Sequence, residues 1–100
     1  MDIQSGLGVG QKWKKVIKIA GVNYVNETGK PIAMSVIFSA QAAGIANVGC
    51  TVDGLWIAGF QKKMALNDFE TLYFIVPPSA VYQIQNASAI ALTLKFNELS

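Results

Sequence analysis

Large apolar side chains alternate with small or polar ones along much of this chain. The segment PIAMSVIFS, residues 31–39, places four large residues on one face: Ile32, Met34, Val36 and Phe38. Because the side chains of a β-strand point alternately to opposite faces, this pattern predicts a strand with one face in the core. Residues 90–97 repeat the pattern and predict a second such strand, with these core residues: Ile90, Leu92, Leu94 and Phe96.

The segment VGCTVDGLWIA, residues 48–58, predicts a β-hairpin. Asp53-Gly54 separates two β-rich runs and is a preferred two-residue turn, in which both residues take positive φ. The turn predicts a register in which these residues share the core face: Val52, Leu55, Cys50 and Ile57. Trp56 then points the opposite way. We expect it to be a binding platform or part of a subunit interface, and the interface is favoured.

A further strand is predicted at residues 69–76, FETLYFIV, and both of its faces are apolar. We expect such a strand to be covered on two sides, by its own core and by another molecule. Pro77-Pro78 ends it, and a short strand follows at residues 81–85. The candidate residues for an oligomer interface or surface binding site are Trp13, Trp56, Tyr73, Ile75 and Tyr82.

Turn-forming segments at residues 26–31, 41–49 and 61–68 separate these elements, and the last two are the only places where a helical turn fits. About seven strands at intervals of eight to twelve residues are typical of a sandwich. The predicted fold is all-β, a single antiparallel β-sandwich or jelly-roll-like domain over residues 11–100, preceded by a flexible glycine-containing leader at residues 1–10.

The glycines of GLGVGQKW, residues 6–13, raise the alternative of a phosphate-binding loop. Such a loop follows a buried strand and opens a helix whose N-terminal amides meet the phosphate. The residues that follow, KWKKVIKI at 12–19, have the period of a strand. We therefore favour the leader over a nucleotide site.

The composition predicts self-association. The 100 residues are 52% hydrophobic and only 14% charged, whereas an ordinary domain carries about 25% charged residues. The missing charge indicates that part of the exterior is covered by another copy of the chain. No stretch reaches the roughly eighteen apolar residues of a membrane-spanning helix, so we expect no membrane insertion.

The residue inventory argues against catalysis and cofactors. The chain has no histidine, the commonest acid–base group and metal ligand, and its one cysteine, Cys50, lies on a predicted inward face. Only Asp68 and Glu70 form a close acidic pair, at a strand entrance where acidic residues are common. We expect no enzyme activity, no metal and no cofactor.

A lysine cluster surrounds Trp13, with Lys12, Lys14, Lys15 and Lys18. A basic stripe with an aromatic residue can bind a nucleic-acid backbone. However, lysines at alternate strand positions are also the usual protection of an edge strand. The net charge of +2 adds no general attraction to polyanions, so a nucleic-acid partner is disfavoured.

Several motifs together resemble a small β-sandwich module of tailed bacteriophages, found in tail-fibre and tail-tip (knob) proteins. They are GVGQKW (8–13), GVNYVNETGKPI (21–32), VDG (52–54), FIVPPSAVYQI (74–84) and FNEL (96–99). The match covers the chain from Gly8 onward. Ser79 stands where the family pattern has glycine, and Phe96 replaces its closing tryptophan. These are turn and core signatures, which indicate fold more strongly than activity.

The resemblance implies a non-enzymatic virion structural protein of the phage tail, a homotrimeric knob or tip. Its expected partners are copies of itself, other tail proteins and a host surface glycan or protein, bound by contact and avidity. The alternative is a free-standing carbohydrate-binding β-sandwich module, in which Trp56, Tyr73 or Tyr82 stacks against sugar rings. The exposure of these aromatic residues discriminates between the two.

Overall fold

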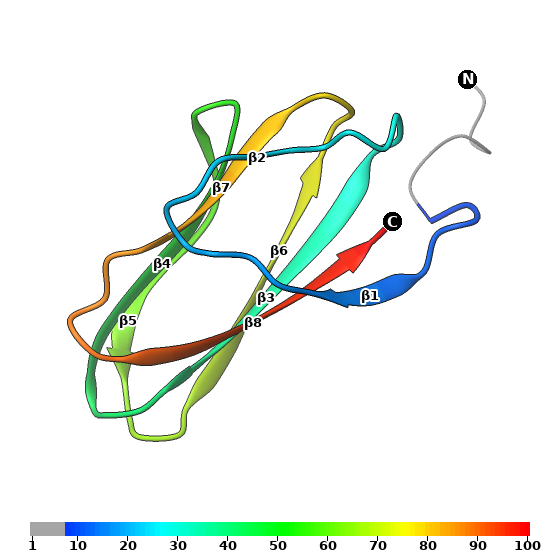
Figure 1. Ribbon diagram of the computed structural model, residues 1–100. Coiled ribbons are helices and arrows are strands. Elements are labelled where there is room, and N and C mark those ends of the chain that lie inside the picture. The colour runs from blue at the N-terminus through cyan, green and yellow to red at the C-terminus, as the bar shows by residue number, and fades with distance from the viewer. Residues whose placement is uncertain (1–7) are drawn as a thin grey trace.

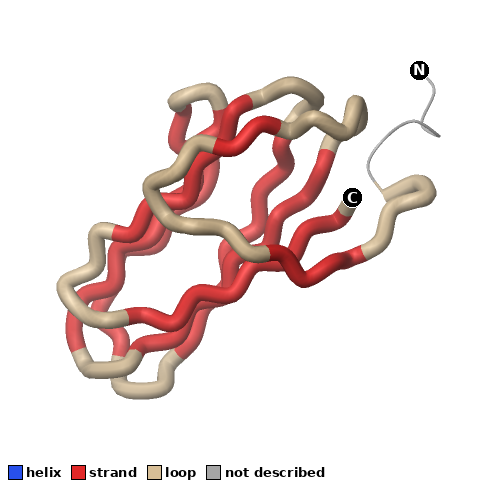
Figure 2. The backbone as a smooth tube through the Cα atoms, in the orientation of Figure 1, coloured by secondary structure: helices blue, strands red, loops and turns tan. Residues whose placement is uncertain are grey.

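The fold consists of two antiparallel four-stranded sheets (Figure 1). The structure is a computed structural model that describes residues 8–100. The strands are β1 (Trp13–Val16), β2 (Tyr24–Val25), β3 (Ile32–Ala40), β4 (Gly44–Val52), β5 (Leu55–Met64), β6 (Phe69–Val76), β7 (Val81–Asn86) and β8 (Leu92–Leu99). One sheet has the order β1-β8-β3-β6 and the other β2-β7-β4-β5. Loops join the strands and no helix is present within residues 8–100 (Figure 2). The predicted β-sandwich is therefore confirmed.

The strand boundaries differ from prediction mainly around the second hairpin. Residues 41–49 and 61–68, where the sequence allows a helical turn, contribute largely to strands, because β4 begins at Gly44 and β5 continues to Met64. These ends pair with each other, Gly44 opposite Met64. Small residues at this end of β4 allow close packing, and Ala46 lies fully in the core. The eighth strand, β2, has only two residues and was not predicted.

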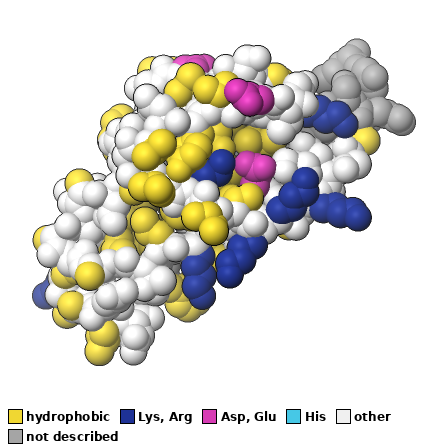
Figure 3. Space-filling view, viewed as in Figure 1, with side chains coloured by type: hydrophobic (Ala, Val, Ile, Leu, Met, Phe, Trp, Pro, Cys, Tyr) yellow, Lys and Arg dark blue, Asp and Glu magenta, His cyan; other side chains and the backbone are white. Residues whose placement is uncertain are grey.

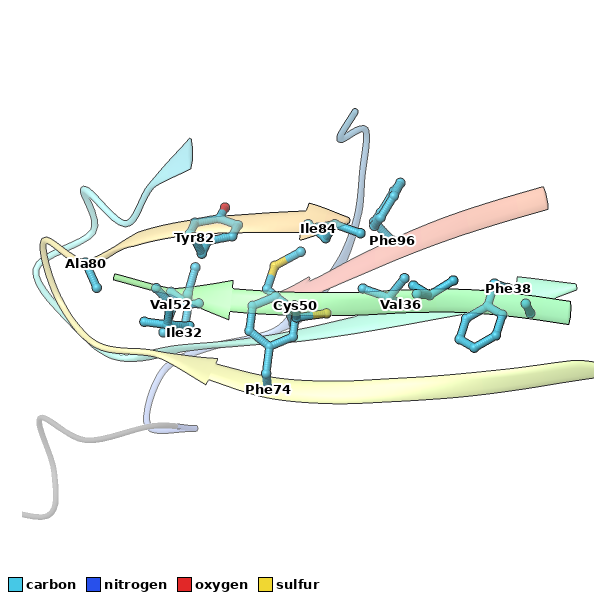
Figure 4. Packing of buried hydrophobic residues seen from close by; sticks show 14 of the residues in the cluster. Ile32, Val36, Phe38, Cys50, Val52, Phe74, Ala80, Tyr82, Ile84 and Phe96 are labelled. Carbon is cyan, nitrogen blue, oxygen red and sulfur yellow. The ribbon is translucent and has the colours of Figure 1, made fainter. Parts of the chain in front are cut away.

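The core lies between the two sheets and is built from the inward side chains of both (Figure 4). The large faces predicted for residues 31–39 and 90–97 point into it, and Met34, Val36 and Phe38 are fully buried. Tyr82 is also a core residue, with 2% of its surface exposed. Its ring lies 5.7 Å from that of Tyr24 and 6.2 Å from that of Phe74, measured between centroids. The prediction of Tyr82 as an interface or sugar-stacking residue is therefore wrong.

The hairpin of β4 and β5 has the predicted turn but a different register beyond it. Asp53 and Gly54 have φ of 50° and 81°, as the turn requires. The pairing then shifts, so that Thr51 faces Trp56 while Cys50 faces Ala58. This β-bulge adds Ile57 as an unpaired residue and redirects the strand. Ile57 is consequently 51% exposed, and Leu55, at the hairpin tip before the bulge, is 68% exposed. Their prediction as core residues is wrong.

A buried asparagine ties together two of the turns that frame the sandwich. Asn26 is 2% exposed, and its Nδ2 donates hydrogen bonds to the carbonyls of Lys30, Val76 and Pro77 at 2.7, 3.0 and 3.1 Å. Its Oδ1 accepts from the backbone N–H and the hydroxyl of Thr28. The turn before β3 and the turn after β6 thus form one hydrogen-bonded corner.

The predicted leader, residues 1–10, lies mostly outside the described residues, which begin at Gly8. Residues 8–10 form a turn in which Gly8 and Gly10 have positive φ. The strand β1 follows directly, at the edge of its sheet and paired with β8. A strand, not a phosphate-binding helix, therefore follows these glycines.

Candidate functional site

Three of the predicted site residues come together on the outer face of sheet β1-β8-β3-β6. In one row across the sheet, Trp13 pairs with Leu99, Leu99 with Ala33, and Ala33 with Ile75. In the next row, Ser35 pairs with Tyr73. Residues two apart along a strand point to the same face of the sheet, so the side chains of these two rows share one face. We call this surface the Trp13 face and define it by Trp13, Ser35, Ile37, Tyr73 and Ile75.

The Trp13 face contains two adjoining shallow depressions, with small side chains at their base. Trp13 and Tyr73 line one depression of about 370 Å³ together with Ser35 and Ile37. Both aromatic rings are more than half exposed, whereas Ser35 is buried. The second depression, of about 510 Å³, extends past Ile75 to Ile57 of the neighbouring sheet. The bulge that exposes Ile57 therefore enlarges this apolar surface.

Trp56 lies on the other sheet and does not join the Trp13 face. It projects from the outer face of β2-β7-β4-β5 and is 61% exposed, in the direction that the sequence predicts. It lines a depression of about 560 Å³, which we call the amide groove and define by Asn47, Trp56, Gly59, Phe60, Gln61, Gln85 and Ala87. This volume is within the range of about 300–1,000 Å³ that is usual for ligand sites.

Gly49, on the neighbouring strand, makes room for the indole ring of Trp56. Gly49 pairs with Gly59 across β4 and β5. A Cβ on Gly49 would lie 1.6 Å from Cζ3 of Trp56, so the ring rests directly on the Gly49 backbone. Thr51, which pairs with Trp56, is buried. One side of the indole is thus supported by protein, and the ring remains largely open to solvent.

Neutral amides line the rest of the groove. Nε2 of Gln85 donates a hydrogen bond to Oε1 of Gln83 at 2.7 Å. Nε2 of Gln83 in turn donates to the carbonyl of Gly21 and to Oδ1 of Asn23, both at 3.1 Å. This chain of hydrogen bonds holds Gln85 in place. Asn47 and Gln61 pair across β4 and β5, and their side-chain amides form no hydrogen bond within residues 8–100. The backbone N–H of Asn47 donates to Oγ of Ser88.

The lysines near Trp13 do not form one binding surface with it. Figure 3 shows lysine side chains spread over the part of the surface where Figure 1 draws β1 and β8. Successive lysines of β1 point to opposite sides of this edge strand, as is usual for edge protection. Lys18 is turned back instead, with Nζ 4.3 Å from the centroid of the Tyr24 ring, a cation–π contact.

Two side chains considered as catalytic candidates, Cys50 and Asp68, are held in the core and in a turn. Burial raises the pKa of the Cys50 thiol to about 12, which leaves it protonated and unreactive at neutral pH. Oδ2 of Asp68 accepts a hydrogen bond from the Ala65 N–H within the turn before β6. Residues 8–100 contain no cluster of three or more potential metal-ligating His, Cys, Asp or Glu residues. They also contain no helix long and apolar enough to span a membrane.

Comparisons with known proteins identify the fold and nothing finer. No family model matches the chain, and neither does any curated protein. Among solved structures, dimeric latent PorU from Porphyromonas gingivalis is similar, with a TM-score of 0.51 and 15% identity over 96% of this chain. The chain spans 10% of the PorU chain. At this identity the likeness supports the β-sandwich architecture alone.

Sequence reasoning found the tryptophan of the amide groove but missed most of the other residues. Gly49, Asn47 and Gln61 fall within the predicted turn-forming segments 41–49 and 61–68, and no sequence signal marks Gly59. The polar alternation of Gln83 and Gln85 in β7 was the available signal, since these two residues must share an outward face. The pairing of β7 with β4, which brings Gln85 opposite Gly49, cannot be read locally.

Proposed function

We propose that the chain is a non-enzymatic structural module of a bacteriophage tail, a knob or tip that associates as a homotrimer and contacts the host surface. The observation that carries the self-association is the Trp13 face, which exposes Trp13, Tyr73 and Ile75 side by side. A grouped apolar surface of this kind is typical of an interface, unlike single exposed residues. The low content of charged residues supports the same proposal.

The tail assignment draws its support from the motifs of the resemblance. The segments NETGKP and VPPSA, distant in the sequence, meet in the corner organised by Asn26. Ser79, which replaces the pattern's glycine, has a φ of 66°, a conformation that glycine adopts without strain. The glycine of the family pattern therefore suits the positive φ that the backbone has at position 79.

The mass in solution tests the proposal. Sedimentation equilibrium of the full chain should give the mass of three copies. The double variant Tyr73→Lys with Ile75→Lys should lower the association constant by about thirtyfold or more per substituted interface residue. Both side chains are exposed in the single chain, so the fold should survive. Trp56→Ala, on the other sheet, is the matched control and should leave the mass unchanged. A monomer at all concentrations would contradict the proposed assembly.

A second function is favoured by a separate observation, the amide groove. A free-standing carbohydrate-binding module would need an exposed aromatic platform among hydrogen-bonding side chains, and Trp56 with Gln61 and Gln85 provides one. A monomeric chain that binds glycan would favour this alternative. A trimer that adsorbs to host cells would favour the tail module.

A further inference from the structure

We propose that the amide groove binds an uncharged sugar ring, which stacks on Trp56 and exchanges hydrogen bonds with Asn47, Gln61 and Gln85. The proposal rests on the recognition part of the proposed function and names its site and ligand class. It does not depend on the number of copies, because every lining residue belongs to one chain, and all but Ala87, which follows β7, lie in the sheet β2-β7-β4-β5.

The platform is the first step of the argument. The face of an indole ring carries a partial negative charge, and the C–H groups on a sugar ring carry a partial positive charge, so the two stack favourably. Trp56 has the necessary open surface at 61% exposure. Contact with the Gly49 backbone fixes the ring before any ligand arrives, which reduces the entropy lost on binding.

The chemistry of the lining selects the ligand class. Each amide offers N–H donors beside a carbonyl acceptor, which matches hydroxyl groups that donate and accept from neighbouring positions. None of the residues that line the groove is ionisable. An anionic ligand would find no cation among them, and a cationic one no carboxylate. A neutral sugar therefore fits this lining better than a charged one.

The shape argues for a ring within an extended chain. The groove is open rather than enclosed, and Gly59 lines it without a side chain. A proline-rich peptide is the other ligand that stacks on aromatic side chains, but such peptides dock between several of them. The exposed aromatic side chain here is Trp56 alone, since Phe60 packs edge-on against Phe38 in the core. The amides favour the sugar.

The test uses the full chain carrying Trp13→Phe, so that Trp56 is the only tryptophan. The probes are neutral oligosaccharides of glucose, mannose, galactose and N-acetylglucosamine at about 10 mM, enough to occupy a site of roughly millimolar affinity. At least one should shift the indole N–H resonance and the fluorescence of Trp56. The variants are compared through their backbone amide resonances, because Trp56→Ala in this background has no tryptophan. Trp56→Ala should weaken binding about tenfold or more, and Gln61→Ala about fivefold.

Matched controls separate this site from the Trp13 face. Tyr73→Ala removes an exposed aromatic residue from the other sheet and should leave sugar binding unchanged. No shift with any neutral probe, or binding that survives Trp56→Ala, would overturn the proposal. Binding confined to uronic-acid polymers or to a proline-rich peptide would overturn it as well. A monomer that still binds sugar would contradict the trimer only, so the two proposals fail separately.

Discussion

Trp56 lies across the backbone of Gly49, on the outer face of the sheet β2-β7-β4-β5. A Cβ on Gly49 would approach Cζ3 of the indole to 1.6 Å and Cε3 to 2.6 Å, closer than any van der Waals contact allows. The Asp53-Gly54 turn places Trp56 opposite Thr51, and the register shift beyond this pair places Gly49 opposite Gly59. The glycine at position 49 leaves the space that the ring occupies.

Gly49→Ala should dislodge the indole of Trp56 while leaving the fold intact. Gly49 has ordinary negative-φ backbone, so alanine brings no backbone strain, but its methyl group occupies the position of the ring. We expect a free energy of unfolding within about 1 kcal/mol of the parent, because lost ring contact offsets the entropic gain of replacing glycine. In the Trp13→Phe background, Gly49→Ala should increase the quenching of Trp56 fluorescence by acrylamide.

Gly59→Ala is the control for this substitution. Gly59 pairs with Gly49, but a Cβ there would meet no atom within 4 Å. Alanine should therefore stabilise the strand by about 0.5–1 kcal/mol without altering the quenching of Trp56. Equal quenching in the two variants would show that Gly49 does not seat the ring.

The core of the sandwich could be predicted because its signal is local. Alternation in residues 31–39 and 69–76 gives the face of each residue directly, and Asp53-Gly54 gives the position and type of the turn. The bulge could not be predicted, since nothing in the letters LWIA marks Ile57 as the extra residue. This unpaired residue exposes Ile57, whereas Leu55 keeps its predicted partner Val52 and is exposed at the hairpin tip.

The candidate surfaces required information that only the pairing of distant strands provides. Trp13 and Tyr73 stand on either side of Ser35 because β3 and β8 bring β1 and β6 onto one sheet. Tyr82 looked like a surface aromatic residue, but the inward face of β7 includes it with Ile84. Local alternation identifies the two faces of β7, and only the assembled sandwich shows which one is covered.

Ser79→Gly should stabilise the chain. Ser79 has a φ of 66°, a left-handed conformation that costs an ordinary L residue about 1 kcal/mol and glycine very little. The side chain of Ser79 is exposed, so little contact is lost. Denaturant unfolding should show a gain of up to about 1 kcal/mol, because the entropy that glycine adds to the unfolded chain offsets part of the relief. Asn67→Gly is the comparison, because Asn67 has a similar φ of 70° but asparagine tolerates it, and its gain should be smaller.

Asn26→Ala should be strongly destabilising. It removes the amide that serves three backbone carbonyls and the Thr28 hydroxyl at a buried position. Leaving several buried groups unsatisfied should cost about 3 kcal/mol or more. Asn86→Ala makes the same change at an exposed residue that accepts one hydrogen bond from Ser88, and should cost under about 1 kcal/mol. Similar losses in thermal unfolding would contradict a structural role for the corner.

Alkaline pH should destabilise the fold through Cys50. Burial raises the pKa of this thiol from 9.0 to about 12, so between these values the folded state keeps a proton that the unfolded state has lost. Stability is therefore fully present below pH 9.0 and decreases as pH rises toward about 12, by about 1.4 kcal/mol per pH unit for one proton. Every other ionisable side chain is common to the parent chain and Cys50→Ala. The difference between the two unfolding free energies should therefore narrow with rising pH, because only the parent loses the thiol contribution. A constant difference across the range would mean that the thiol is not protected from solvent in the folded chain.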